Sequence, residues 1–219
     1  MYRFLLGLFW IFAFVYLVTM HQAPYPAHWL VKAIPALSLA VLVSIYLEGG
    51  RSVLLAAALV FSAGGDIVLS LEDDSAGNKF VVGLGLFLVA HCCYIAAFAI
   101  DWKYQRARLP LMIGIVALSG VMTVILLPYL GDLRFPVLVY LAVITGMALF
   151  ATLNTRGGML LILGAVLFMV SDAAIAVNKF VLPEPHSAAP YLIMPTYYAA
   201  QYCIALAFVR SLFLPPQSR

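Results

Sequence analysis

Eight long apolar runs, separated by short polar breaks, dominate this sequence. They cover residues 3–20, 29–47, 53–71, 80–100, 110–128, 135–152, 157–177 and 189–213. An α-helix of about 17–25 residues rises far enough to cross the hydrocarbon core of a bilayer. The composition agrees, since 65% of residues are hydrophobic and 10% charged, against about 45–50% and about 25% in soluble domains. We therefore expect an all-α, polytopic membrane protein built as a bundle of eight transmembrane helices.

The polar breaks are too short to hold a soluble domain, so residues 1–219 are expected to form a single integral membrane domain. Any chemistry must then take place in or beside the bilayer, with membrane lipids as neighbours. The net charge is only +3, and no dense basic run of the kind that binds nucleic acid is present. We expect no nucleic-acid partner.

The positions of Lys and Arg predict an orientation, because short cytoplasmic loops carry an excess of these residues. With the N-terminus inside, the lysines and arginines assigned to the outer side are Lys32, Lys79, Arg134 and Lys179. The larger inner set places both termini in the cytoplasm. Compact loops without sorting signals favour a bacterial inner membrane. No stripe of small residues identifies a helix interface, which leaves a homodimer open.

Two aspartates lie inside apolar runs, Asp66 in the third run and Asp172 in the seventh. An ionisable side chain at membrane depth is costly and usually faces the bundle interior, where it marks a functional site. The alternative is a buried carboxylate that only joins helices through hydrogen bonds, for example to Ser62 or Ser70. We expect the two aspartates to face one pocket.

A weak internal similarity supports this pairing. When residues 53–70 are aligned with 159–176, Asp66 superposes on Asp172. The offset skips four spans, so both helices would run in the same direction and hold their carboxylates at one depth. This pattern is typical of a parallel four-helix internal repeat, whose interface commonly holds the site. His91 follows Asp66 by 25 residues, and Tyr197 follows Asp172 by the same distance.

Two further helices carry polar stripes at helical spacing. The first stripe is His91 with Tyr94, and the second is Tyr197 or Tyr198 with Gln201. A lone histidine in an apolar run is often a packing residue, yet a buried imidazole needs a polar partner, and an aspartate is the natural one. Two aspartates and one histidine offer no established metal-binding spacing, so we expect neither a metal nor another cofactor.

Lys32 begins the second run near the outer interface, followed by Pro35. A lysine here often extends its amine to the interface without any specific role. The functional interpretation is a cation that binds a lipid phosphate or acts on one of the aspartates.

Two carboxylates held close together in a low dielectric do not readily ionise together, so one is an acid while the other is a base. Such a pair suits proton-dependent catalysis. It equally suits a proton-coupled transporter of a small amphiphile, and a third possibility is a structural or lipid-binding membrane protein. The sequence lacks the Gly-x-Ser-x-Gly motif of serine hydrolases.

These residues resemble the YhhN family, which includes mammalian transmembrane lysoplasmalogenases. The resemblance is carried by residues 32–35, 62–69, 85–94, 164–172 and 198–201. Family members often show a Lys-Pro-Leu-Pro type segment where this chain has Lys32-Ala33-Ile34-Pro35. The family's usual length and eight spans match the count made from the apolar runs.

The resemblance implies hydrolysis of the vinyl ether bond of a lysophospholipid, a lysoplasmalogen, to a fatty aldehyde and glycerophosphoethanolamine or glycerophosphocholine. Vinyl ethers hydrolyse by protonation of carbon and capture of the resulting cation by water, which requires an acid and a base. On this interpretation Asp66, Asp172 and His91 are catalytic. The substrate-binding candidates are Lys32, Tyr94, Tyr197, Tyr198 and Gln201.

Overall fold

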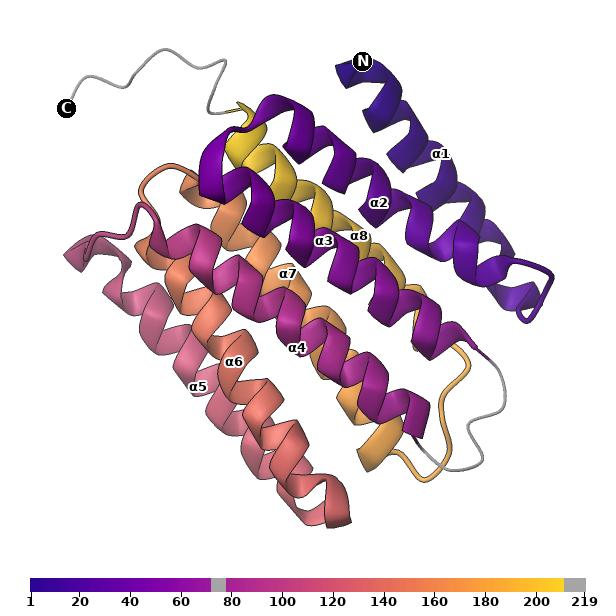
Figure 1. Ribbon diagram of the computed structural model, residues 1–219. Helices are drawn as coiled ribbons and strands as arrows, with labels where there is room; N and C mark the ends of the chain where they lie inside the picture. Colours follow the sequence, from indigo (N-terminus) through magenta and orange to yellow (C-terminus); the bar gives the residue numbers. More distant parts are fainter. Residues whose placement is uncertain (72–77, 211–219) are drawn as a thin grey trace.

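The computed structural model describes residues 1–71 and 78–210, and in these ranges it contains eight helices long and apolar enough to span a membrane (Figure 1). They are α1 (Tyr2–Thr19), α2 (His28–Tyr46), α3 (Gly49–Ser70), α4 (Asn78–Ala99), α5 (Leu109–Leu126), α6 (Arg134–Leu153), α7 (Gly158–Ala176) and α8 (Pro190–Val209). Each apolar run thus forms one helix, and the described residues form no strand. The all-α, eight-helix prediction is confirmed. The expected end of the last run, residues 211–213, lies outside the described residues.

Short helical turns extend several of these spans. They are η1 (Met20–Gln22), η2 (Arg106–Arg108), η3 (Leu127–Tyr129), η4 (Gly131–Leu133) and the π-helical turn η5 (Val177–Val181). The last of these follows α7 without a break, so the seventh span continues to Val181. Asp66 and Asp172 each lie four residues before the final residue of their α-helices.

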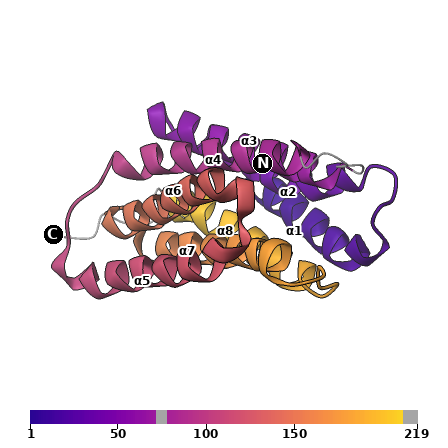
Figure 2. The same cartoon turned by 90° about the horizontal axis from the view of Figure 1, so that it is seen from below.

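Helix α8 lies at the centre of the bundle. It contacts α1, α2 and α7, and 67% of its most apolar window is buried, against 22% for α1 and for α5. Viewed from below, α3 and α4 lie on one side, α5 and α7 on the other, and α6 and α8 between them (Figure 2). Tyr197, Tyr198 and Gln201 of α8 are therefore buried in the protein interior rather than exposed to lipid.

The two halves of the chain pack in a similar way. Neighbouring helices contact each other in chain order within α1–α4 and within α5–α8. Between the halves, α4 packs on α6 and α2 packs on α8. Replacing each helix by the one four positions later exchanges these two contacts, which is what a parallel four-helix repeat would produce.

Two glycines allow close helix approach on the two helices that carry the aspartates. A Cβ atom at Gly65 of α3 would lie 2.6 Å from the ring of Phe87 on α4, and one at Gly164 of α7 would lie 2.8 Å from Ile204 on α8. Real Cβ atoms do not tolerate such distances, so both positions require glycine for the observed packing. Gly65 thereby places the Phe87 ring next to the turn that carries Asp66.

An ion-pair cluster joins three segments at the end of the bundle where α3 begins. Arg51 donates a hydrogen bond to Asp101 in the α4–α5 connection, and Arg156 lies 3.3 Å from the same carboxylate. The fully buried Asn154 donates to the backbone carbonyl of Phe98 at 2.9 Å. Arg51 precedes the start that the sequence predicts for the third helix, at residue 53, yet it lies within α3.

Candidate active site

Asp66 is buried between three helices and has two charged or polar partners. Its Oδ1 lies 3.4 Å from the Lys32 ammonium of α2, and its Oδ2 accepts a 2.6 Å hydrogen bond from the Tyr197 hydroxyl of α8. Only 3% of the aspartate is exposed. A buried carboxylate requires such partners, because neither lipid nor apolar side chains replace its hydration.

The Lys32 side chain is itself nearly buried, with 12% exposed, and points to Asp66. The backbone carbonyl of Lys32 accepts a 3.0 Å hydrogen bond from the Tyr198 hydroxyl. Tyr198 therefore fixes the turn of α2 that presents the lysine.

Asp172 of α7 forms a second polar cluster with side chains from two other helices. It accepts a hydrogen bond from the Tyr140 hydroxyl of α6, and His91 Nε2 of α4 lies 3.5 Å from its Oδ2. His91 Nε2 also lies 2.9 Å from the Tyr140 oxygen. His91 is fully buried, whereas 14% of the Asp172 side chain is exposed.

The three groups form a directed chain of hydrogen bonds. A phenol has one proton, and Tyr140 donates it to Asp172, so the Tyr140 oxygen must accept from His91 Nε2–H. That arrangement leaves His91 Nδ1 as the ring's other polar atom, and within the described residues it has no hydrogen-bond partner. The imidazole is thus oriented by Tyr140 and has one nitrogen left for a ligand or a water molecule.

The two clusters are related in the same way as the two halves of the chain. Asp66 takes one partner from α2, in its own half, and another from α8, the last helix of the other half. Asp172 likewise takes one partner from α6 and another from α4. His91 follows Asp66 in the chain but contacts Asp172. Tyr197 follows Asp172 at the same spacing but contacts Asp66.

The aspartates are joined through aromatic rings rather than by a direct contact. The partners that the structure records for Asp66 and for Asp172 form two separate sets. The Phe168 ring lies 4.7 Å from that of His91 and 5.5 Å from that of Tyr197, so it adjoins both sets. The structure brings Lys32 and Tyr197 of the predicted set to Asp66, and His91 of that set to Asp172. The shared acid–base dyad stays a prediction.

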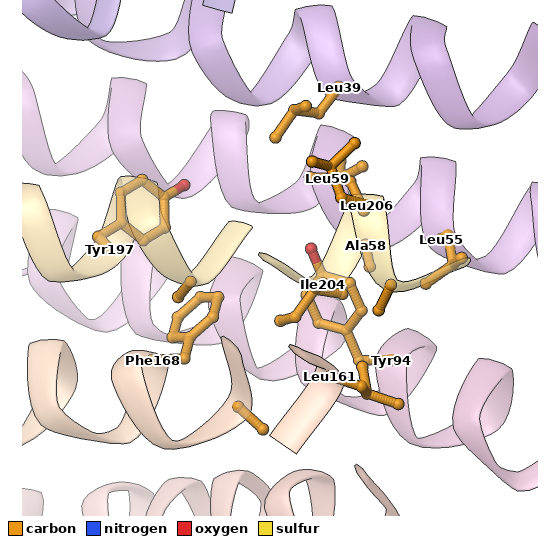
Figure 3. Packing of buried hydrophobic residues seen from close by; sticks show 14 of the residues in the cluster. Leu39, Leu55, Ala58, Leu59, Tyr94, Leu161, Phe168, Tyr197, Ile204 and Leu206 are labelled. Carbon is orange, nitrogen blue, oxygen red and sulfur yellow. The ribbon is translucent and has the colours of Figure 1, made fainter. Parts of the chain in front are cut away.

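A third polar group lies beside these clusters. The Tyr94 hydroxyl of α4 donates to Gln201 Oε1 of α8, and both residues are fully buried. Ser62 of α3 lies near the Tyr94 phenol without a hydrogen bond of adequate geometry. In Figure 3 the hydroxyl oxygens of Tyr94 and Tyr197 both point toward the side of the view on which Leu39 and Leu59 lie. Tyr94 and Gln201 are thus paired as neighbours, and both belong to the predicted set.

Asp172 and Tyr140 also line two small apolar cavities. One, of about 60 Å³, lies between α4, α6 and α7 and includes Leu84 and Phe87. The other, of about 50 Å³, lies between α5, α6 and α7 and includes Met122. Asp66 lines neither cavity. The carboxylate that meets apolar space is therefore Asp172.

A larger hollow of about 440 Å³ lies at the end of α3, against the α1–α2 connection. Its lining includes Tyr25, His28, Trp29 and Ser70. His28 begins α2 one helical turn before Lys32, so the hollow lies next to the lysine of the first cluster.

Sequence reasoning missed Tyr140, which is the only tyrosine in an apolar stretch of α6 and has no charged neighbour there. The one available signal was that a buried tyrosine hydroxyl usually has a hydrogen-bond partner. Within residues 1–71 and 78–210, no three side chains of His, Cys, Asp or Glu gather closely enough to hold a metal ion.

Comparison with known proteins adds an independent observation. The model of the YhhN family matches residues 27–208. Lysoplasmalogenase TMEM86A of Homo sapiens is 40% identical over 162 residues, which cover 70% of this chain and 64% of that protein. Lysoplasmalogenase TMEM86B of Sus scrofa is 36% identical over 85% of this chain and 77% of its own length. A lysoplasmalogenase of Mycobacterium tuberculosis is 33% identical over 69% of this chain and 58% of its own length.

The matched region thus spans somewhat less than two thirds of the human TMEM86A protein. No solved structure gives a significant match to this chain.

Proposed function

Since the chain belongs to the YhhN family, we propose that it is a membrane-embedded hydrolase that cleaves the vinyl ether bond of a lysoplasmalogen. The products are a fatty aldehyde and glycerophosphoethanolamine or glycerophosphocholine. The observation that carries the proposal is the partly buried Asp172 beside the fully buried His91, at the wall of apolar cavities. An acid in an apolar lining fits a substrate whose reactive carbon is the first part of a hydrocarbon chain. Relatives named lysoplasmalogenase support the same reaction.

The reaction needs an acid that protonates carbon and a base that activates water. Asp66 and Asp172 supply these two functions. Each is held in place by neighbouring donors, which is the preorganisation that electrostatic catalysis requires. His91 and Tyr140 orient Asp172, and Tyr197 and Lys32 orient Asp66.

The head group lies at the membrane interface near Lys32. The hollow beside His28 and Trp29 offers space for it one turn from the lysine, and an ammonium group attracts a phosphate. Tyr25 and Trp29 provide aromatic faces that suit an ethanolamine or choline cation. Tyr94, Tyr198 and Gln201 keep α2, α4 and α8 in register around the site.

The protein is a multi-pass membrane protein, as its eight spans indicate. We place it in a bacterial inner membrane with both termini in the cytoplasm, from the distribution of Lys and Arg. In that orientation the hollow beside Lys32 faces the outer side. A homodimer is compatible with this arrangement but is not required by it.

The test is turnover of purified protein in lipid nanodiscs with lysoplasmenylethanolamine, read as fatty aldehyde by mass spectrometry. The matched control substrate is the saturated alkyl ether of the same chain length, which has no double bond to protonate. We expect aldehyde from the vinyl ether alone. If neither substrate is cleaved, and a pH gradient instead drives lipid uptake into proteoliposomes, the protein is a carrier.

A further inference from the structure

We propose that the two polar clusters perform different steps, and that Ser62 and Gln201 bind the water molecule that is consumed. Asp172 protonates the vinyl carbon, and Asp66 accepts a proton from the bound water. The inference rests on the proposed vinyl ether hydrolysis and deepens it, because it assigns the acid and the base and adds a water site.

Two buried polar atoms on the Asp66 side lack partners among the described residues. They are Ser62 Oγ and Gln201 Nε2, and both residues are fully buried. Burying such an atom without a hydrogen bond is unfavourable, so native proteins rarely do so. A buried water with two to four polar neighbours is the usual solution.

Helical spacing directs both atoms to the Asp66 cluster. Ser62 precedes Asp66 by four residues on α3, and Gln201 follows Tyr197 by four on α8, so each pair shares a helix face. Tyr94 connects the two, since it is hydrogen-bonded to Gln201 and lies near Ser62. A water held by the Ser62 hydroxyl and the Gln201 amide therefore lies beside the Asp66–Tyr197 pair.

The other cluster suits contact with the hydrocarbon part of the substrate. Tyr140 and Asp172 line both apolar cavities, and the lining is otherwise mostly aliphatic or aromatic. A cavity of this kind stays dry and takes an apolar group. The acid that must reach the vinyl carbon is thus on the apolar side, while the water site is on the polar side, and Phe168 adjoins both.

A proton passes from Asp172 to the carbon β to oxygen, a C–H bond forms, and the adjacent carbon becomes an oxocarbenium ion. The water oxygen bonds to that carbon and its proton passes to Asp66, which gives a hemiacetal. The bond to the glycerol oxygen then breaks, that oxygen takes the proton held by Asp66, and the hemiacetal hydroxyl gives its proton to Asp172, so both carboxyl groups return to their starting states. The sum is one vinyl ether and one water giving one aldehyde and one alcohol.

Turnover in D₂O separates these steps. Wild-type protein will place one deuterium beside the aldehyde carbonyl and leave recovered substrate unlabelled, because water captures the cation before the deuteron is lost. If capture is impaired, the cation reverts to the vinyl ether and the recovered substrate gains deuterium. Mass spectrometry of substrate and product at matched short times measures both outcomes.

We expect Asp172→Asn to abolish both product and substrate labelling. Asp66→Asn, Ser62→Ala and Gln201→Leu should lower product formation at least tenfold while labelling the recovered substrate. Ser52→Ala is the matched control, since Ser52 is also a buried serine of α3, with its own partner, the Val43 carbonyl. The unfolding temperature of each variant is first compared with that of the wild type. If Ser62→Ala or Gln201→Leu lowers it markedly, Ser62→Cys or Gln201→Met takes its place.

If the substrate recovered from Asp172→Asn gains deuterium and that from Asp66→Asn does not, the assignment of Asp172 as acid and Asp66 as base is reversed and the proposal is overturned. Unlabelled recovered substrate in all the Ser62 and Gln201 variants, or their unchanged turnover, would overturn the water site. If wild-type protein forms no aldehyde from the vinyl ether, the proposed function itself has failed, which is a distinct result.

Discussion

Tyr197 donates a 2.6 Å hydrogen bond to Asp66, a residue 131 positions earlier in the chain. This bond joins the last helix of the bundle to the third, so the two halves of the chain build the Asp66 cluster together. The matching contact of the second aspartate joins Asp172, in the second half of the chain, to His91, in the first half. Each aspartate thus takes one of its two partners from the half of the protein that does not contain it.

Removing the Tyr197 hydroxyl leaves a buried carboxylate oxygen without its donor. Tyr197→Phe should lower the free energy of unfolding by about 1–3 kcal/mol and reduce turnover by at least tenfold. Thermal unfolding in detergent and aldehyde release measure the two effects. Tyr202→Phe is the control on the same helix, because Tyr202 makes ring contacts with Phe9 and Trp10. Equal effects of both variants would count against the Asp66 contact.

Removing only one charge of the Lys32–Asp66 pair should lower the free energy of unfolding more than removing both charges. Lys32→Met leaves a buried, uncompensated carboxylate and is expected to destabilise by about 3–5 kcal/mol. The double variant Lys32→Met/Asp66→Asn should recover much of that stability yet remain inactive. A double-mutant cycle from unfolding midpoints tests this. Additive losses would show that the two groups do not interact.

Tyr140 is expected to act by positioning His91 and Asp172. Tyr140→Phe removes the hydroxyl that joins them, and turnover should fall about 10²-fold or more, the usual range for disrupted acid–base catalysis. KM should change little, because phenylalanine keeps the ring that lines the cavities and only the hydroxyl contact with the carboxylate is lost. A rise in KM at constant kcat would instead assign Tyr140 to substrate binding alone.

The cavities beside Asp172 should determine the preferred chain length. Ala176 lines both of them, so Ala176→Phe fills apolar space. We expect kcat/KM to fall more for long-chain than for short-chain lysoplasmalogens. Competition between two chain lengths in one assay gives the ratio directly. An unchanged ratio would show that the hydrocarbon chain of the substrate does not occupy these cavities.

The ion pair between Arg51 and Asp101 lies at the opposite end of α3 from Asp66, so its role is expected to be structural. Asp101→Asn should lower the unfolding temperature while folded protein keeps its KM and kcat. Steady-state kinetics on the folded fraction check this. A specific loss of kcat would show that this end of the bundle acts on the site.

The fold followed from the sequence because hydrocarbon thickness sets the length of each span, so eight apolar runs became eight helices with similar bounds. The placement of His91 and Tyr197 beside the opposite aspartates also had a sequence signal, in their equal spacing from Asp66 and Asp172. That signal gave the helices involved. It did not say which aspartate each residue would contact, since that depends on how the two halves dock.

Other features had little or no local signal. Tyr140 resembles any tyrosine in an apolar helix, and its importance comes from the polar atoms that α4 and α7 bring to it. Arg51 and Asp101 are 50 positions apart and look like ordinary charges at helix ends. Their pairing depends on the bundle, because only the packed helices bring the two ends together.

The central claim is that Asp66 and Asp172 are both required for vinyl ether cleavage. The most direct measurement is aldehyde release from lysoplasmenylethanolamine by purified wild-type protein, Asp66→Asn and Asp172→Asn, compared at equal amounts of folded protein. We predict that each substitution lowers kcat by about 10²-fold or more. Asp66→Asn should also lower the unfolding temperature, because it leaves the Lys32 ammonium without its partner, which is why only folded protein is compared. Full activity in both substituted proteins would contradict the account.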